Sequence, residues 1–235
     1  MRRTLRVAVP LAALTLIAAV AVAGKGPRPV DAIVLSPEFA GANVRSIAML
    51  PVVSYTHDVQ VEKLVAGLWG QSFRESGYRW VSAPTARDML MAGGSDSLLK
   101  SVREALLKSP RVDSAQAGPL CARFRTHALL AVRVDRWDQN QIEWNQSGRP
   151  STTVQLTAAL VDSAGRLLWS AAGSETVQGP FHDPSTNPIG VTSGGLSTQP
   201  ITGEGGPPAY DDVLRRILAR WVEQFPKAVI AAPAK

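Results

Sequence analysis

The sequence has few of the residues from which metal sites and disulfides are built. Its 235 residues include one cysteine, Cys121, and three histidines. A single cysteine excludes an intrachain disulfide and a cysteine-based zinc site. The histidines, His57, His127 and His182, are far apart, and none has a His-x-x-x-His spacing. We therefore expect no metal, and we predict that Cys121, in an apolar helical stretch, is a buried thiol.

Recognisable catalytic and cofactor motifs are also absent. The sequence has no G-x-S-x-G, H-E-x-x-H, Walker or G-x-G-x-x-G motif. The glycines at 203–206 lack the Lys-Ser/Thr that follows in a phosphate loop. His57 and Asp58 follow the first predicted strand, and a helix-capping aspartate beside a solvated histidine is favoured there over hydrolytic chemistry. We predict that the protein is not an enzyme, with no catalytic residues and no cofactor.

Strong charge of one sign is missing. The formal charge is +6, and half of it comes from Arg2, Arg3 and Arg6, which lie in a segment that we expect to be removed. No run of lysine or arginine occurs elsewhere. Such a mild excess is atypical of nucleic-acid binders, so no nucleic-acid partner is expected.

Only one long apolar run is present, from Val7 to Ala23, and it follows the three arginines. It ends in Ala21-Val22-Ala23 before Gly24, which is typical of a signal peptide over 1–23 cut between Ala23 and Gly24. The alternative is an uncleaved inner-membrane anchor, although about 17 residues is short for spanning a bilayer. No cysteine follows for lipid attachment. We predict a periplasmic or secreted protein that touches a membrane only through an uncleaved leader.

A β-hairpin over Ser151–Thr176 is the clearest feature of the remaining chain. Val154, Leu156, Ala158 and Leu160 alternate with their neighbours, as in a half-buried strand. Asp162-Ser163-Ala164-Gly165 then provides turn chemistry before a second alternating run.

The other periodic segments predict the rest of the fold. Apolar strand patterns occur at Val44–Val53, Tyr78–Ser82 and His127–Trp137. Helical spacing occurs at Val59–Ser76, Pro84–Met91, Ser97–Lys108, Ser114–Arg125 and Tyr210–Phe225. This order predicts an α+β, two-layer fold with a mixed sheet of about five strands. It begins with a βαβ unit, continues into an antiparallel three-strand meander and ends with a C-terminal amphipathic helix.

The domain limits follow from composition. Residues 24–43 hold several prolines and predict an extended lead-in to a single domain over 44–226. Within it, residues 179–208 are rich in glycine and proline, which favours a mobile loop. Residues 227–235 are expected to form a flexible tail.

Six tryptophans stand out among few other aromatic residues. Trp69, Trp169 and Trp221 fit core positions, whereas the rest of the candidates lie on or beside two loops, 139–150 and 179–208. The candidate partner contacts are Trp137, Trp144, Asn145, Phe181 and His182. For Trp144, folding back over the sheet edge remains an equal alternative.

Three stretches resemble a group of bacterial envelope domains. Ser46–Pro51 is similar to an "I-A-V-L-P" opening strand, Thr126–Val134 to "G-A-D-A-L-L-V-G-x-V", and Val154–Trp169 to "V-x-L-x-A-x-L-V-D-x-x-T-G-x-L-L-W". The group comprises the curli-secretion lipoproteins, the amino-terminal domain of the Tol-system protein TolB and the lipoprotein activators of peptidoglycan synthases. Unlike these lipoproteins, the chain has no lipid-attachment cysteine, and nothing in it resembles the transmembrane hairpins of the curli pore.

The resemblance implies a non-enzymatic periplasmic accessory domain that acts by protein–protein contact in envelope assembly or maintenance. Its partner would be an envelope protein, bound through the loops 139–150 and 179–208. The alternative is a small-molecule or glycan-binding protein that uses Trp137, Trp144 and the 179–208 loop.

Overall fold

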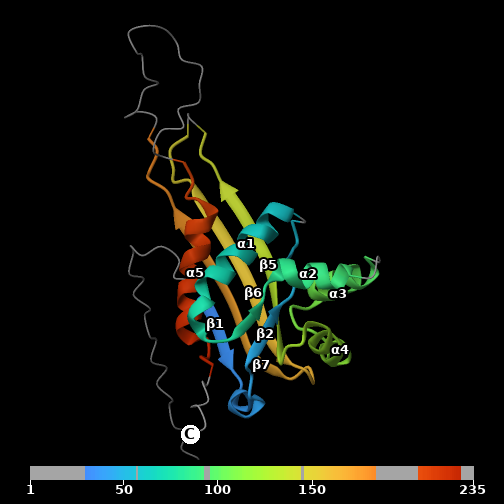
Figure 1. Cartoon of the computed structure of the whole chain (residues 1–235). Helices are drawn as coiled ribbons and strands as arrows, with labels where there is room; N and C mark the ends of the chain where they lie inside the picture. Colours follow the sequence, from blue (N-terminus) through green and yellow to red (C-terminus); the bar gives the residue numbers. More distant parts are fainter. Residues whose placement is uncertain (1–29, 57, 93–95, 144–145, 184–205, 229–235) are drawn as a thin grey trace, which may run out of the picture.

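Strands β6 (Ser151–Asp162) and β7 (Leu167–Gln178) form the predicted hairpin at the centre of the sheet. The structure is a computed structural model that describes residues 30–56, 58–92, 96–143, 146–183 and 206–228 (Figure 1). The hairpin turn is held by the Asp162 carboxylate, which accepts hydrogen bonds from the backbone N–H groups of Ala164 and Arg166, both at 2.9 Å. Gly165 lies beside them at φ +76°, a conformation that disfavours a side chain.

The sheet is mixed and has the order β1-β7-β6-β5-β2-β4, with β3 also paired to β5. Strand β5 (Ala128–Asn140) is antiparallel to β6 and parallel to β2 (Ser46–Met49) and β3 (Val53–Ser54). Strand β4 (Arg79–Val81) continues the parallel part beside β2. The predicted α+β class, the βαβ start and the antiparallel meander are confirmed.

The sheet has seven strands where about five were expected, and each of the two additional strands has a physical explanation. The first predicted strand is divided into β2 and β3 around Pro51, which has no N–H for the ladder. Strand β1 (Val30–Leu35) lies inside the expected lead-in and pairs antiparallel with β7 at the sheet edge. The prolines around it concealed a strand from sequence reasoning, because an edge position tolerates flanking prolines. A short 3-10 helix, Pro37–Ala42, follows it.

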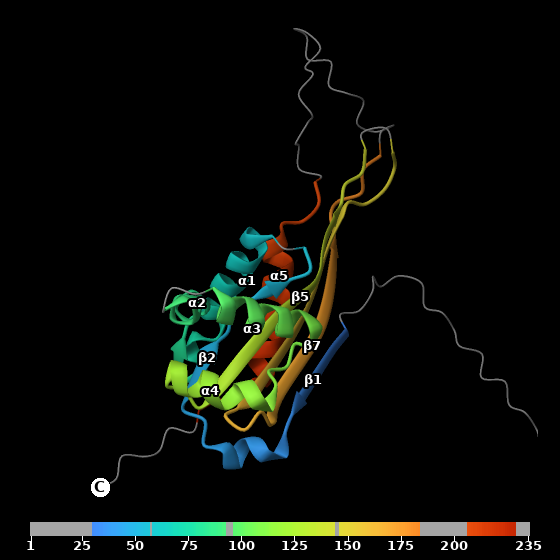
Figure 2. The same cartoon turned by 90° about the vertical axis from the view of Figure 1, so that its right-hand side faces the viewer.

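Helices cover both faces of the sheet. Helices α1 (Val59–Ser72) and α5 (Tyr210–Gln224) pack on one face. Helices α2 (Ala83–Met91), α3 (Ser97–Lys108) and α4 (Ser114–Phe124) cover part of the other. A 3-10 turn, Arg74–Ser76, follows α1. The cover is uneven, because α2, α3 and α4 lie over the parallel strands and β5 and extend only to the end of β6 (Figure 2). Among the described residues, no helix combines the length and apolar content needed to span a bilayer.

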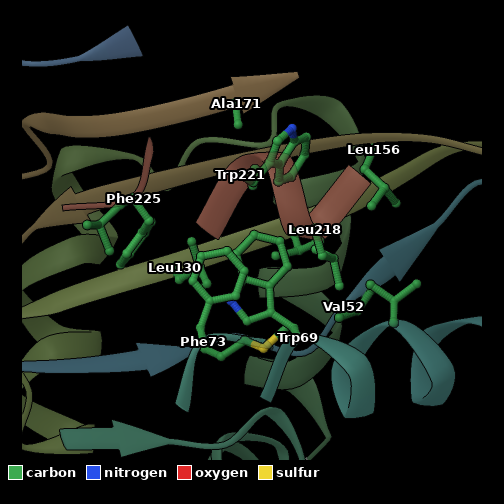
Figure 3. Close-up of a cluster of buried hydrophobic side chains, with 14 of the residues drawn as sticks. Val52, Trp69, Phe73, Leu130, Leu156, Ala171, Leu218, Trp221 and Phe225 are labelled. Carbon is green, nitrogen blue, oxygen red and sulfur yellow. The ribbon is translucent and has the colours of Figure 1, made fainter. Parts of the chain in front are cut away.

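Aromatic side chains fill the core under α1 and α5 (Figure 3). Trp69, Trp169 and Trp221 are fully buried, which confirms their predicted core positions. The Trp221 ring meets those of Trp69 and Trp169 edge-on, with centroids 5.8 and 6.1 Å apart. Phe73 stacks on Trp69 at 4.4 Å. Such offset and edge-on pairs stabilise a core beyond the burial of their area.

Helix α5 lies close to the sheet at Gly173 of β7. A Cβ there would overlap the Asp31 carboxylate of β1 and lie 3.1 Å from Trp221 Nε1. The guanidinium of Arg220 forms ion pairs with Asp31 and with Glu175, the latter at 2.9 Å. Because Gly173 has no side chain, the Trp221 indole and the ion pairs of Arg220 can hold α5 against β1 and β7.

Gly173→Ala is expected to lower the free energy of unfolding by about 2 kcal/mol, since the added methyl displaces Asp31 or Trp221. Gly67→Ala is the matched control, because a Cβ on this exposed position of α1 meets nothing within 4 Å. It should stabilise the protein by about 0.5–1 kcal/mol through helix propensity. Urea unfolding monitored by circular dichroism measures both, and equal stability of the two variants would contradict the close contact at Gly173.

Candidate contact site at the distal end of the sheet

Strands β5, β6 and β7 extend past the helices and end together (Figure 1). We call this end the distal tip, and it consists of the described residues 137–143, 146–152, 176–183 and 206–210. The loops 139–150 and 179–208, which the sequence analysis singled out, both begin here. Residues 144, 145 and 184–205 lie outside the described residues, so the predicted contacts Trp144 and Asn145 are not placed.

The two loops are paired with each other through their backbones. Gly148 N–H donates to the carbonyl of His182 at 3.0 Å, and His182 N–H donates back to Gly148 at 2.7 Å. Gly179 N–H donates to the Pro150 carbonyl at 2.7 Å. These bonds continue the β6–β7 ladder beyond the last residues of the strands. Two segments about 30 residues apart in the chain therefore form one ordered surface.

Phe181 and Arg149 are both exposed on this surface. Phe181 is 56% exposed, and the guanidinium carbon of Arg149 lies 5.8 Å from its ring centroid. Arg149 also donates from Nη1 to the Gly179 carbonyl at 3.3 Å. The predicted contact His182 is half-buried, and its backbone pairs with that of Gly148. The cation–π contact and the hydrogen bond reduce the conformational freedom of both side chains before any partner arrives.

Trp137, a predicted partner contact, is partly covered by the start of α5. It is half-buried and stacks on Tyr210, the first residue of α5, with centroids 4.4 Å apart and planes 12° apart. A bulge between Val134 and Arg136 shifts the alternation of β5, so that Trp137 rather than Arg136 faces α5. Partial burial, with a smaller effect from Asp138, raises the pKa of the Tyr210 hydroxyl.

The segment that leads into α5 is also hydrogen-bonded to the tip. The Pro208 carbonyl accepts hydrogen bonds from the buried Thr152 hydroxyl and, at 3.1 Å, from Gln139 Nε2. A Cβ on Gly179 would lie 2.8 Å from the Gly206 carbonyl oxygen, so the two described ends of the 179–208 loop meet. The start of α5 and the residues just before it therefore contact the tip, through the stacking on Trp137 and the hydrogen bond from Thr152.

A metal ion would need a cluster of ligands at the tip, and a small molecule would need a cavity there. Within the described ranges, no cluster of three or more His, Cys, Asp or Glu side chains could hold a metal ion. Two shallow cavities, of about 210 and 140 Å³, lie between α3 and α4 and between the ends of α1 and α5. Neither is lined by a tip residue.

The other residues singled out in the sequence lie away from the tip. Asp58 caps α1 as predicted, accepting a hydrogen bond from Gln60 N–H at 2.7 Å. His57 and the predicted cleavage site, Ala23 and Gly24, are outside the described residues. Sequence reasoning missed Arg149 and Tyr210, and the only signal for either was its position beside a predicted loop.

Cys121 is buried in α4, as its apolar surroundings predicted. Burial, together with the nearby Asp162 carboxylate, raises the pKa of its thiol to about 11. A thiol with such a pKa is protonated at neutral pH and is a poor nucleophile.

Comparisons with known proteins find distant likenesses only. No family model matches the chain, and no curated protein matches it. Among solved structures, it is similar to the lipoprotein GNA1162 from Neisseria meningitidis, at 23% identity and a TM-score of 0.43, over 57% of this chain and 83% of that one. It is also similar to the PelC dodecamer from Paraburkholderia phytofirmans, at 15% identity and a TM-score of 0.40, over 81% and 95% of the two chains.

A third similar structure is the hypothetical protein CT253 from Chlamydia trachomatis, at 14% identity and a TM-score of 0.39, over 75% and 95% of the two chains. At these identities and TM-scores the likenesses assign no function to this chain.

Labelling of Cys121 by a thiol reagent at pH 8 should be at least about a hundredfold slower in the folded protein than in urea. The reason is that the pKa rises from 9.0 to about 11 on folding, which removes almost all thiolate. Absorbance at the wavelength of the released reagent gives both rates. Similar rates in the two states would show that the thiol is reactive and open to solvent.

Proposed function

We propose that the protein is a non-enzymatic accessory domain, exported to the periplasm, that binds an envelope protein through its distal tip. One observation carries this proposal: two separate loops are paired so that Arg149 and Phe181 lie together at the free end of the sheet. The envelope location rests on the predicted leader and on the resemblance of three sequence stretches to envelope domains.

The composition of the tip favours a protein partner. Arginine and large aromatic side chains are enriched at the centres of protein interfaces, where one or two residues provide most of the binding free energy. An exposed phenyl ring gains from transfer out of water, and the guanidinium beside it can bind a carboxylate or carbonyl of the partner. Since the pair is already ordered by the Gly179 carbonyl, binding loses less side-chain entropy.

The same geometry gives less support to the alternative of a glycan or small-molecule binder. One face of the Trp137 indole is occupied by Tyr210 and is therefore closed to a sugar ring. Small-ligand sites are usually concave, and neither of the two cavities described above is lined by a tip residue. A thermal shift of several degrees with a glycan or metabolite panel would restore this alternative.

Site-specific photocrosslinking in the native host tests the proposal. A photoreactive residue at exposed Gln178, three residues before Phe181 in the chain, should give a discrete adduct with one envelope protein. The same residue at exposed Met91 on α2 should give none. Phe181→Ala and Arg149→Ala should each reduce the Gln178 adduct about tenfold or more, as expected for interface centres.

Val34→Ala is the matched control, because Val34 is 58% exposed and lies on β1, away from the tip. The proposal fails if the adduct forms equally from Met91, or if it survives both tip substitutions in proteins that remain folded by circular dichroism.

A further inference from the structure

Three arginines meet at the end of the molecule opposite the distal tip. Arg45, Arg79 and Arg125 precede or begin the parallel strands β2, β4 and β5, whose amino ends lie side by side. Arg79 N–H donates to the Arg45 carbonyl at 3.1 Å, and Arg79 Nη2 donates to the Arg125 carbonyl at 2.7 Å. All three side chains are exposed. We call this group the basic end.

Two carboxylates at this end of the sheet pair with Arg166 instead of with these arginines, and a third, Glu75, lies on the 3-10 turn that precedes β4. Asp162 pairs with Arg166 at 2.7 Å, and Glu38 lies 3.8 Å from the same guanidinium. None of the three arginines of the basic end forms an ion pair with another described residue. Lys227 adds a further positive charge nearby, because Ala228 N–H donates to the Ser76 carbonyl just before β4. The end therefore carries a local excess of positive charge.

Folding keeps these like charges together against their mutual repulsion. Arg125 also occupies the left-handed region, at φ +54°, where α4 ends and where glycine or asparagine is the usual residue. Burial does not explain an arginine at this position, since its side chain is exposed. The repulsion among the arginines would be compensated by an anion bound outside the protein.

We propose that the basic end binds the phosphate headgroups of an anionic membrane surface. The arginines are spread over three strand ends, and neither described cavity is lined by any of them, so they fit an extended anionic surface better than one enclosed anion. Arginine suits phosphate because its planar group donates two parallel hydrogen bonds. This contact is independent of the predicted leader and goes beyond the expectation that only the leader touches a membrane.

This contact determines how the protein is oriented on the membrane. Strand β5 runs from the basic end to the tip over 13 residues, or about 40 Å. A protein bound to phosphate headgroups by the basic end holds its distal tip away from the bilayer, toward partners in the periplasm.

Vesicle co-sedimentation tests the inference. A chain that begins at Gly24 contains every described residue and lacks the apolar leader. It should bind vesicles of phosphatidylcholine with one third phosphatidylglycerol and should not bind phosphatidylcholine alone. The variant Arg45→Gln/Arg79→Gln/Arg125→Gln should bind about a hundredfold more weakly, since each basic residue near an anionic leaflet contributes about fivefold.

Two matched variants serve as controls. Lys63→Gln/Lys100→Gln/Arg216→Gln removes the same charge from exposed positions on α1, α3 and α5 and should weaken binding less than threefold. Arg45→Lys/Arg79→Lys/Arg125→Lys keeps the charge and should bind within about fivefold of the unchanged protein. It also separates lost charge from lost folding, which thermal unfolding checks directly.

Three results would overturn the inference. They are equal binding to both vesicle types, equal weakening by the two glutamine variants, and complete release by 20 mM inorganic phosphate at matched ionic strength. The last would indicate a discrete phosphate site instead of a membrane surface. Resistance to phosphate with release by 0.5 M sodium chloride is the supporting outcome, since salt screens surface charge.

Discussion

The packing of Trp221 against Gly173 determines how the other parts of this protein are placed. Because residue 173 has no side chain, the indole and the neighbouring ion pairs of Arg220 hold α5 close to β1 and β7. The same indole meets Trp69 and Trp169, which connects α5 to α1 and to the middle of the sheet (Figure 3). This packing thus closes the larger hydrophobic core, and the neighbouring ion pair of Arg220 with Asp31 adds to the backbone pairing that holds the edge strand β1 on β7.

The position of α5 in turn decides where the tip begins. Its first residue, Tyr210, stacks on Trp137. The Pro208 carbonyl, two residues earlier, accepts a hydrogen bond from the buried Thr152 hydroxyl. Beyond this point the strands have no helix packed on them, and the two loops satisfy several backbone groups by pairing with each other. The bonds between Gly148 and His182 do this, and they order Arg149 and Phe181. The position of α5 therefore determines both the packing of the core and the accessibility of the tip.

Periodicity predicted most of the fold, because each predicted helix and the central hairpin bury one regular face. Periodicity did not predict the features that depend on contacts between residues far apart in the sequence. The edge strand β1 depends on Arg220, 189 residues away, to pair its Asp31. The bulge in β5 reverses which side chain faces α5, and a strict alternation of two cannot show it. For the site, the sequence located both loops but could not show that they pair or that Trp137 is covered.

Amide hydrogen exchange at the distal tip tests the account most directly, since a preformed tip is what the proposed contact requires. The amides of Gly148, Gly179 and His182 donate to backbone carbonyls at 2.7–3.0 Å. They should exchange at least tenfold more slowly than the same sequence in an unstructured peptide. Slow exchange would show that the paired loops are a stable extension of the sheet. Exchange at the peptide rate would mean that the tip is not ordered in solution, and the contact surface described for it would not exist before binding.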